Sequence, residues 1–251
     1  MIGVFDSGLG GLSTLLALRK LCPEADIVYL ADQAHAPYGE RSPKELCSYL
    51  RFGIDFFQRQ GAEAMLLACG TLSAVALPQL ENPPPFPLFG VIEGATAKAK
   101  EKTKSGVAVL ATSASIRSKV YQSRLLDMGV RHIEAVACPL LVPLLEEGFL
   151  WDSPATKEVL AHYLAPLKAS GCDTVLLGCT HYGFLAPLFQ ALWPKAQLVP
   201  CGEVLAEYTL SHFVPRKGQG KTLLYTTGAP NEFLKKTSAL HFAPPTVVLR
   251  A

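Results

Sequence analysis

The segment AEAMLLACGTLSA, residues 62–74, combines the features that decide the fold. Residues 64–69 form a continuous apolar run, which is typical of a strand covered on both faces of a parallel sheet. The run ends in a thiol, Cys69, and the next residues lead into a helix-compatible stretch. Most buried cysteines are small core residues, but a thiol at this position can also act as a base or a nucleophile.

Similar apolar runs recur along the whole chain and alternate with longer helix-like stretches. One such stretch, residues 42–61, opens with Ser42 and Pro43 in N-cap and first-turn positions and closes on Gly61. This β-α-β alternation predicts an α/β fold with parallel sheets and helices on both faces. The other predicted strands are residues 2–8, 27–32, 88–92, 106–112, 133–138 and 174–179.

The chain also repeats its own pattern. EAMLLACGTLSA (63–74) and DTVLLGCTHYGF (173–184) each contain an acidic residue, an apolar strand, a cysteine, a threonine and a helix-compatible run. Similar openings, IGVFDSGLGGLSTLLAL (2–18) and GVAVLATSASIRSKVY (106–121), precede the two copies. The repeat predicts two related α/β units, and each unit presents one thiol, Cys69 or Cys179.

Length and charge restrict the function further. A chain of 251 residues suits two domains of roughly 125 residues each. The formal net charge of +2 disfavours nucleic acid or an anionic membrane as the main partner. No apolar stretch approaches the roughly 18 residues of a membrane span, and the start of the chain lacks the features of a signal peptide. These properties predict a cytoplasmic protein.

The seven cysteines predict reduced thiols rather than a disulfide framework, because their number is odd, they are widely spread and no secretory signal is present. No CxxC or HxxxH spacing occurs, so a metal site is not expected.

Position gives the two repeated thiols a chemical role. Ligands of parallel sheets bind beyond the carboxyl ends of the strands, where the next helix offers unpaired N–H groups. We therefore expect the pKa of Cys69 and Cys179 to fall from about 8.5 toward neutrality. Inversion of a carbon stereocentre needs a base on one face and an acid on the other, which two facing thiols provide.

Two other interpretations explain less of the sequence. GLGG (8–11) follows a strand like a phosphate loop, but it matches neither GxGxxG nor GxxxxGK[ST], and Asp6 would repel phosphate. A cysteine hydrolase would use Cys179 with His181, but it leaves the matching Cys69 unexplained.

Five motifs in order, GVFDSGLGGLSTL, APYG, ACGTLSA, CPLLVPLLEEG and LGCTHYGFL, resemble the cofactor-independent glutamate racemases of the aspartate/glutamate racemase superfamily. They span residues 2–185. The resemblance implies two pseudo-symmetric α/β domains, residues 1–92 plus 209–251 and residues 93–208, with the C-terminal segment crossing back and the active site in the cleft between them. It further implies racemisation of L- and D-glutamate to supply peptidoglycan, without pyridoxal phosphate, metal or nucleotide, and a homodimer.

The resemblance also assigns roles near the thiols. Cys69 and Cys179 are the expected acid/base pair. Asp6 and Ser7 are expected to contact the substrate on the side of its ammonium group. Asp6 is also expected to help prepare Cys69 for proton transfer. The backbone N–H groups of Gly70 and Thr71, at a helix start, can bind the α-carboxylate.

The substrate's side-chain carboxylate is expected to meet donors from Tyr38 and Gly39 and from Thr180 and His181. His181 lies two residues after Cys179, so it can share or relay the proton of that thiol. Either of two neighbouring carboxylates can orient the imidazole: Glu146 or Glu147.

Three positions depart from the family pattern. Gly70 stands where the family has asparagine, Ser115 where it tends to have threonine, and Cys201-Gly202 where it usually has Asp-Ser. The missing amide leaves three hypotheses open: a glutamate racemase, an enzyme for another dicarboxylate such as aspartate, or a degenerate low-activity member that acts by binding. If the missing side-chain amide weakens binding of the α-carboxylate, Gly70→Asn should raise kcat/KM about 10- to 100-fold. If backbone N–H groups already bind the carboxylate, the variant should change little or crowd the cleft.

Overall fold

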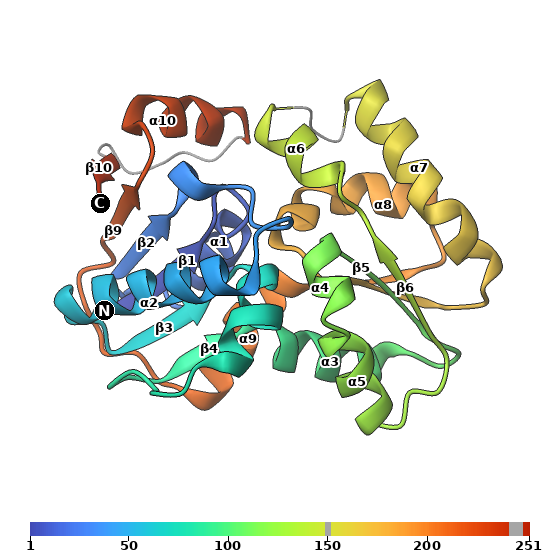
Figure 1. Cartoon of the computed structure of the whole chain (residues 1–251), viewed down its shortest axis with the longest axis horizontal. Helices are drawn as coiled ribbons and strands as arrows, with labels where there is room; N and C mark the ends of the chain where they lie inside the picture. Colours follow the sequence, from blue (N-terminus) through green and yellow to red (C-terminus); the bar gives the residue numbers. More distant parts are fainter. Residues whose placement is uncertain (149–151, 241–247) are drawn as a thin grey trace.

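The computed structural model describes residues 1–148, 152–240 and 248–251, and the strands of this part form two sheets (Figure 1). All strand pairings between these residues are parallel. The first sheet has the order β10-β9-β2-β1-β3-β4 and the second has the order β6-β5-β7-β8. The strands are β1 (Ile2–Asp6), β2 (Ile27–Ala31), β3 (Ala64–Leu67), β4 (Leu88–Gly90), β5 (Val107–Ala111), β6 (Ile133–Ala137), β7 (Thr174–Leu177), β8 (Gln197–Pro200), β9 (Thr222–Thr226) and β10 (Val248–Arg250).

The two sheets confirm the internal repeat. Both units use the same strand order. The second strand of the unit lies on one side of its first strand, and the third and fourth strands lie on the other side, as in β2-β1-β3-β4 and β6-β5-β7-β8. Every residue of β1, β3, β5 and β7 is buried, which explains why these strands are continuous apolar runs rather than alternating ones. Fully burying one such side chain stabilises the fold by roughly 1.5 to 3 kcal/mol.

Helices and short turns of helix connect the strands. The predicted helix at residues 42–61 is α2, and its N-terminus carries a complete capping box between Ser42 and Glu45. Gly61 follows it with a φ of +70°, which favours glycine. The helical elements are α1 (Leu12–Leu21), η1 (Gln33–His35), α2 (Pro43–Arg59), η2 (Leu72–Ala76), η3 (Leu77–Gln79), α3 (Val91–Lys102), α4 (Ser113–Arg117), α5 (Val120–Asp127), α6 (Leu141–Glu146), α7 (Pro154–Ala169), η4 (Thr180–Leu185), α8 (Ala186–Leu192), α9 (Cys201–His212) and α10 (Pro230–Ala239).

The C-terminal segment crosses back to the first sheet, as the resemblance implies. β9 pairs with β2 in parallel, and β10 pairs with β9 (Figure 1). The exact division into residues 1–92 plus 209–251 and residues 93–208 remains a proposal. α9 continues across the boundary at 208/209, and residues 241–247 lie outside the described part.

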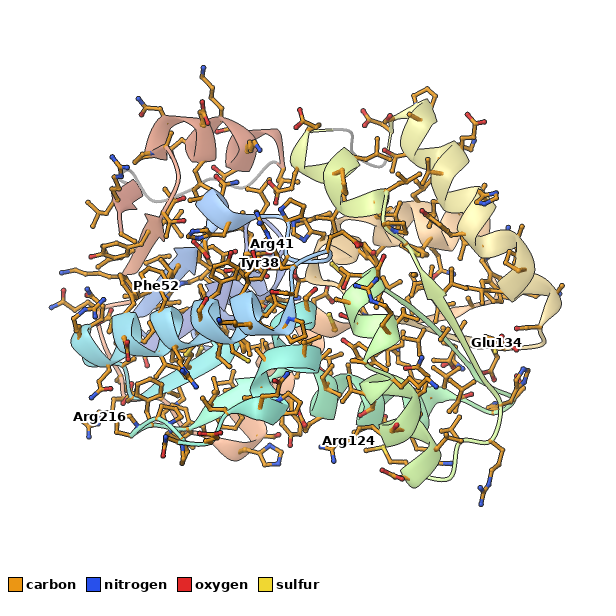
Figure 2. The ribbon with its side chains drawn as sticks, viewed as in Figure 1. Tyr38, Arg41, Phe52, Arg124, Glu134 and Arg216 are labelled. Atoms are coloured by element: carbon orange, nitrogen blue, oxygen red, sulfur yellow. The ribbon has the colours of Figure 1, made fainter. Side chains whose placement is uncertain are left out.

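Helices hold the two units together. α9 packs against α1 of the first unit and also against α3. α3 in turn packs against α5, where Arg124 forms a partly exposed ion pair with Glu93 at 2.9 Å (Figure 2). None of the helices in the described residues is long and apolar enough to cross a membrane.

Candidate active site

A cavity of about 160 Å³ lies at the carboxyl ends of strands from both sheets. Asp6 ends β1, and Cys69 follows β3 in the first sheet. From the second sheet come Thr112 after β5, Cys138 after β6 and Cys179 after β7. Open parallel sheets bind ligands at this edge, so the cavity is the candidate active site.

The cavity brings together ten of the residues that the sequence singles out. Among these, the two thiols Cys69 and Cys179 are both almost completely buried. Ser115, Glu146 and Glu147 do not line the cavity. The predicted lining residues are Asp6, Ser7, Tyr38, Gly39, Cys69, Gly70, Thr71, Cys179, Thr180 and His181. Sequence reasoning missed eight others, namely Pro37, Glu40, Thr112, Ser113, Cys138, Pro139, Val142 and Pro143.

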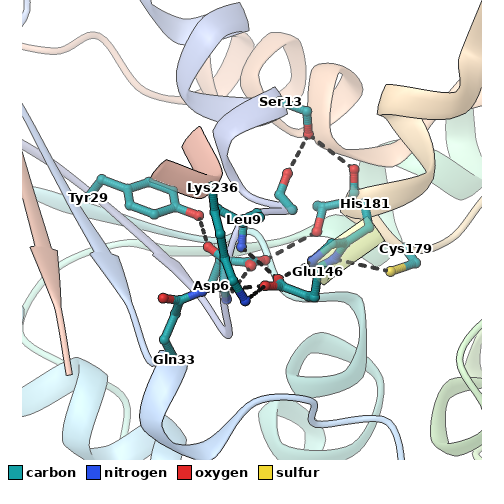
Figure 3. A network of polar contacts seen from close by, with 12 residues as sticks. Asp6, Leu9, Ser13, Tyr29, Gln33, Glu146, Cys179, His181 and Lys236 are labelled. Atoms are coloured by element: carbon teal, nitrogen blue, oxygen red, sulfur yellow. Dashed lines mark hydrogen bonds and ion pairs between the residues drawn. The ribbon is translucent and has the colours of Figure 1, made fainter. Parts of the chain in front are cut away.

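Asp6 connects the two halves of the site. One of its carboxylate oxygens accepts a hydrogen bond from the N–H of Gly8 at 2.8 Å. The other accepts one from the hydroxyl of Thr180 at 3.1 Å, across the cleft (Figure 3). Burial raises the pKa of Asp6, and the charge of His181 and these hydrogen bonds oppose the rise.

Cys69 differs from the sequence expectation. Its pKa is raised, not lowered, because burial and the nearby Asp6 carboxylate both disfavour the thiolate. The backbone N–H groups of Leu72 and Thr71 pull the pKa down, but they do not overcome these two effects. The prediction of a lowered pKa was therefore wrong for Cys69, and this residue carries its proton at rest.

Cys179 belongs to a line of three polar side chains. Its sulfur lies 3.8 Å from Nδ1 of His181, and Nε2 of His181 lies 2.8 Å from Oε1 of Glu146 (Figure 3). Burial lowers the pKa of His181, but Cys179 and Glu146 more than reverse this and raise it well above 6.5. The imidazole is therefore a cation between a thiol and a carboxylate.

Glu146, rather than Glu147, is the carboxylate that orients His181. Burial raises its pKa, but the hydrogen bond and charge of His181, the Leu9 N–H and Lys236 bring it to about 2. Leu9 donates to Oε1 at 3.1 Å, and the Lys236 ammonium lies 3.5 Å from Oε2. Glu146 thus connects α6 of the second unit to the start of the chain and to α10.

Glu146→Gln should lower the free energy of unfolding by about 3 kcal/mol, because it leaves the buried imidazolium without its counter-charge. The raised pKa of His181 contributes stability below 6.5 that is lost as pH rises through the raised value. The lowered pKa of Glu146 contributes stability above 4.5 that is lost as pH falls toward 2. Urea unfolding should therefore give the largest difference between pH 4.5 and 6.5. Glu147→Gln is the control, and an equal loss in both variants would contradict this role.

Tyr38 (Figure 2) lines the cavity, and its hydroxyl is hydrogen-bonded within the protein. The hydroxyl donates to Asp32 at 2.5 Å, and burial together with Asp32 raises the pKa of Tyr38 far above its usual value. Asp32 is fully buried and also accepts from Thr227 at 2.7 Å and contacts Nδ1 of His35 at 2.9 Å.

Tyr38→Phe should leave the KM for substrate within about threefold of the original value, because the hydroxyl proton is committed to Asp32. The variant should lower the free energy of unfolding by roughly 1.5 to 3 kcal/mol, since a buried carboxylate loses a donor. Tyr49→Phe is the matched control, because Tyr49 stacks on Tyr38 with ring centroids 5.0 Å apart. A large rise in KM for Tyr38→Phe alone would show that the hydroxyl binds substrate.

Hydroxyl groups from both units meet in the cavity wall. The hydroxyls of Thr71 and Thr112 lie 2.9 Å apart across the cleft. The hydroxyl of Ser115 lies 2.9 Å from that of Thr112, so Ser115 supports the wall from behind.

Among the lining residues that the structure describes, the charged ones are Asp6, Glu40 and His181, and none is a lysine or an arginine. A carboxylate ligand would therefore be bound by hydroxyls and backbone N–H groups, and the His181 imidazolium gives the lining its positive charge. Within residues 1–148, 152–240 and 248–251, no cluster of three or more His, Cys, Asp or Glu side chains could hold a metal.

The fold and site define a class of protein, in which two matching α/β units each bring a thiol to one shared cavity. The chain belongs to the Asp/Glu/hydantoin racemase family, whose model matches residues 13–209. It is 39% identical to the glutamate racemase of Aquifex aeolicus over 227 residues, which cover 90% of this chain and 88% of that protein.

Solved structures agree with this assignment. The crystal structure of glutamate racemase from Thermus thermophilus in complex with β-chloro-D-alanine gives a TM-score of 0.89 at 34% identity, covering 100% of this chain and 96% of that one. Glutamate racemase from Francisella tularensis in complex with D-glutamate gives 0.87 at 25% identity, covering 99% and 95%.

Proposed function

We propose that this protein interconverts L-glutamate and D-glutamate by proton transfer between the substrate α-carbon and two thiols, Cys69 and Cys179. The observation that carries the proposal is that the two matching thiols of the repeat, Cys69 and Cys179, lie in a single small cavity. Relatives named glutamate racemase, which align with most of the chain, support the activity and the substrate. The product D-glutamate would serve peptidoglycan synthesis.

The reaction uses the two thiols in opposite roles. One thiolate removes the α-proton from one face of the substrate, and the other thiol donates its proton to the opposite face. The first sulfur ends protonated and the second ends as a thiolate, so the reverse reaction starts from the product state. At rest Cys69 holds its proton, and the His181 cation lies beside the other sulfur, with its Nδ1 3.8 Å from Sγ of Cys179.

The remaining lining residues hold the substrate. Asp6 and Ser7 meet the ammonium group. The backbone N–H groups of Gly70 and Thr71 bind the α-carboxylate at the start of the helical turn. Thr180 and the N–H groups of Tyr38 and Gly39 bind the side-chain carboxylate, whereas His181, whose ring nitrogens face Cys179 and Glu146, acts on the thiol. No metal or organic cofactor is required.

Circular dichroism of D-glutamate with the pure protein tests the activity, because loss of optical activity requires catalysis. The signal should decay to zero, and the rate should survive dialysis against a chelator and treatment with a carbonyl reagent. A panel of D- and L-amino acids should show α-proton exchange in deuterium oxide with glutamate. Faster exchange with aspartate than with glutamate would identify aspartate as the substrate. Absence of exchange with every amino acid would favour a protein that binds its ligand without catalysis.

The resemblance further supports a homodimer, and the composition supports a cytoplasmic location. Sedimentation velocity of the pure protein tests the first of these proposals. A single species at the monomer mass over a wide concentration range would contradict it.

A further inference from the structure

Gly70 of the first unit lies against the backbone of the second unit at Gly178. A Cβ atom at this position would lie 2.4 Å from the carbonyl oxygen of Gly178 and 3.4 Å from its carbon. Real Cβ contacts are essentially never below 3.0 Å. Gly70 directly follows one thiol and Gly178 directly precedes the other, so the contact joins the two chain positions that carry the reaction.

The Gly178 carbonyl is held in place from the other side. The hydroxyl of Tyr121 donates to it at 3.0 Å, and the N–H of Gly178 donates to Leu110 at 2.8 Å. Tyr121 is fully buried, and its ring lies 3.0 Å from the position of a Cβ on Gly178. The carbonyl therefore cannot move away from residue 70 without disturbing a packed side chain.

We propose that Gly70 is a positioning residue that sets the separation between Cys69 and Cys179. This inference rests on the proposed two-thiol reaction. A side chain at residue 70 must move the two strand ends apart by about 1 Å to restore an ordinary contact of 3.4 Å. Both thiols must reach one carbon atom, and a misplacement of about 1 Å can reduce a rate roughly 100-fold.

The contact also decides between the two expectations for Gly70→Asn. An asparagine side chain begins with the same Cβ, so it meets the Gly178 carbonyl before its amide can reach a substrate. The structure favours crowding of the cleft over a gain in kcat/KM. In a chain with asparagine at residue 70, the carbonyl of residue 178 must lie further away. The close approach of the two units therefore requires glycine at residue 70.

Gly70→Ala tests the proposal with two reactions that differ in how many thiols they need. Racemisation of glutamate needs both. Loss of chloride from 3-chloroglutamate needs one thiolate to take the α-proton, after which the Cα–H electrons form a C=C bond as chloride leaves. The enamine then hydrolyses to 2-oxoglutarate and ammonia. In Gly70→Ala the kcat for racemisation should fall about 10- to 100-fold. The kcat for chloride release at saturating substrate should fall far less, because weaker binding of the α-carboxylate by the N–H of residue 70 raises KM and only one thiol must reach the α-carbon.

The ratio of the two rates is independent of the fraction of protein that folds, so it remains valid if the variant is unstable. Gly183→Ala is the matched control, because its Cβ would meet its nearest neighbour, Ser13, at 3.7 Å. Adding Tyr121→Phe to Gly70→Ala should recover part of the racemisation rate by releasing the Gly178 carbonyl. Equal falls in both reactions, or no fall in either, would overturn the spacing role. Absence of both reactions in the unmodified protein would instead refute the proposed function.

Discussion

Replacement of either Cys69 or Cys179 by alanine should abolish racemisation, with a fall in kcat of at least about 1,000-fold. The size follows from the loss of a positioned acid or base, which contributes roughly 100- to 10,000-fold to the rate of such a step. Both thiols lie in one cavity and on opposite repeated units. Circular dichroism of both glutamate enantiomers measures the effect.

Three other cysteines provide the control. Cys22, Cys47 and Cys172 lie outside the cavity, so their alanine variants should keep activity near that of the original protein. Full activity in Cys69→Ala or Cys179→Ala would contradict the two-thiol mechanism. Activity lost in all five variants would show that the thiols act through folding.

The sequence predicted the repeat and the strand-end thiols because both depend on local pattern. Continuous apolar runs identify buried parallel strands, and the carboxyl end of each run identifies the edge where ligands bind. This was enough to bring Cys69 and Cys179 into one site, whereas Asp6 was assigned to it by the family resemblance. The three C-terminal strands β8 to β10 were not predicted, because they are only partly buried where described and lack the continuous apolar pattern of β3 or β7. β9 and β10 pair on the β2 side of the first sheet, far along the chain from β2.

The sequence could not predict the direction of side-chain hydrogen bonds. Tyr38 belongs to a motif in the cavity wall, yet its hydroxyl turns to Asp32, which no motif singled out. The choice between Glu146 and Glu147 depends on which side of one helical turn faces His181. The pKa of Cys69 depends on the balance between burial and helix N–H groups, and only the folded surroundings determine that balance.

His181→Asn should lower kcat/KM about 100-fold, because asparagine keeps a polar group near Nδ1 but removes the cation beside Cys179. The fall must be the same for both enantiomers, since they have equal free energies in water and the ratio of their kcat/KM values equals the equilibrium constant. The individual kcat and KM values are free to differ. The direct signature of His181 therefore lies in isotope effects rather than in kcat/KM.

In His181→Asn, proton transfer at Cys179 should limit the rate in both directions. The enantiomer whose α-hydrogen faces Cys179 should then show a larger isotope effect on α-deuteration. The other enantiomer should show a larger solvent isotope effect, because Cys179 supplies its new proton. His132→Asn is the control: its Nε2 lies 3.9 Å from the sulfur of Cys172, a similar thiol-imidazole pair away from the cavity. Equal isotope effects for both enantiomers of His181→Asn would show that the imidazole serves the substrate carboxylate and not the thiol.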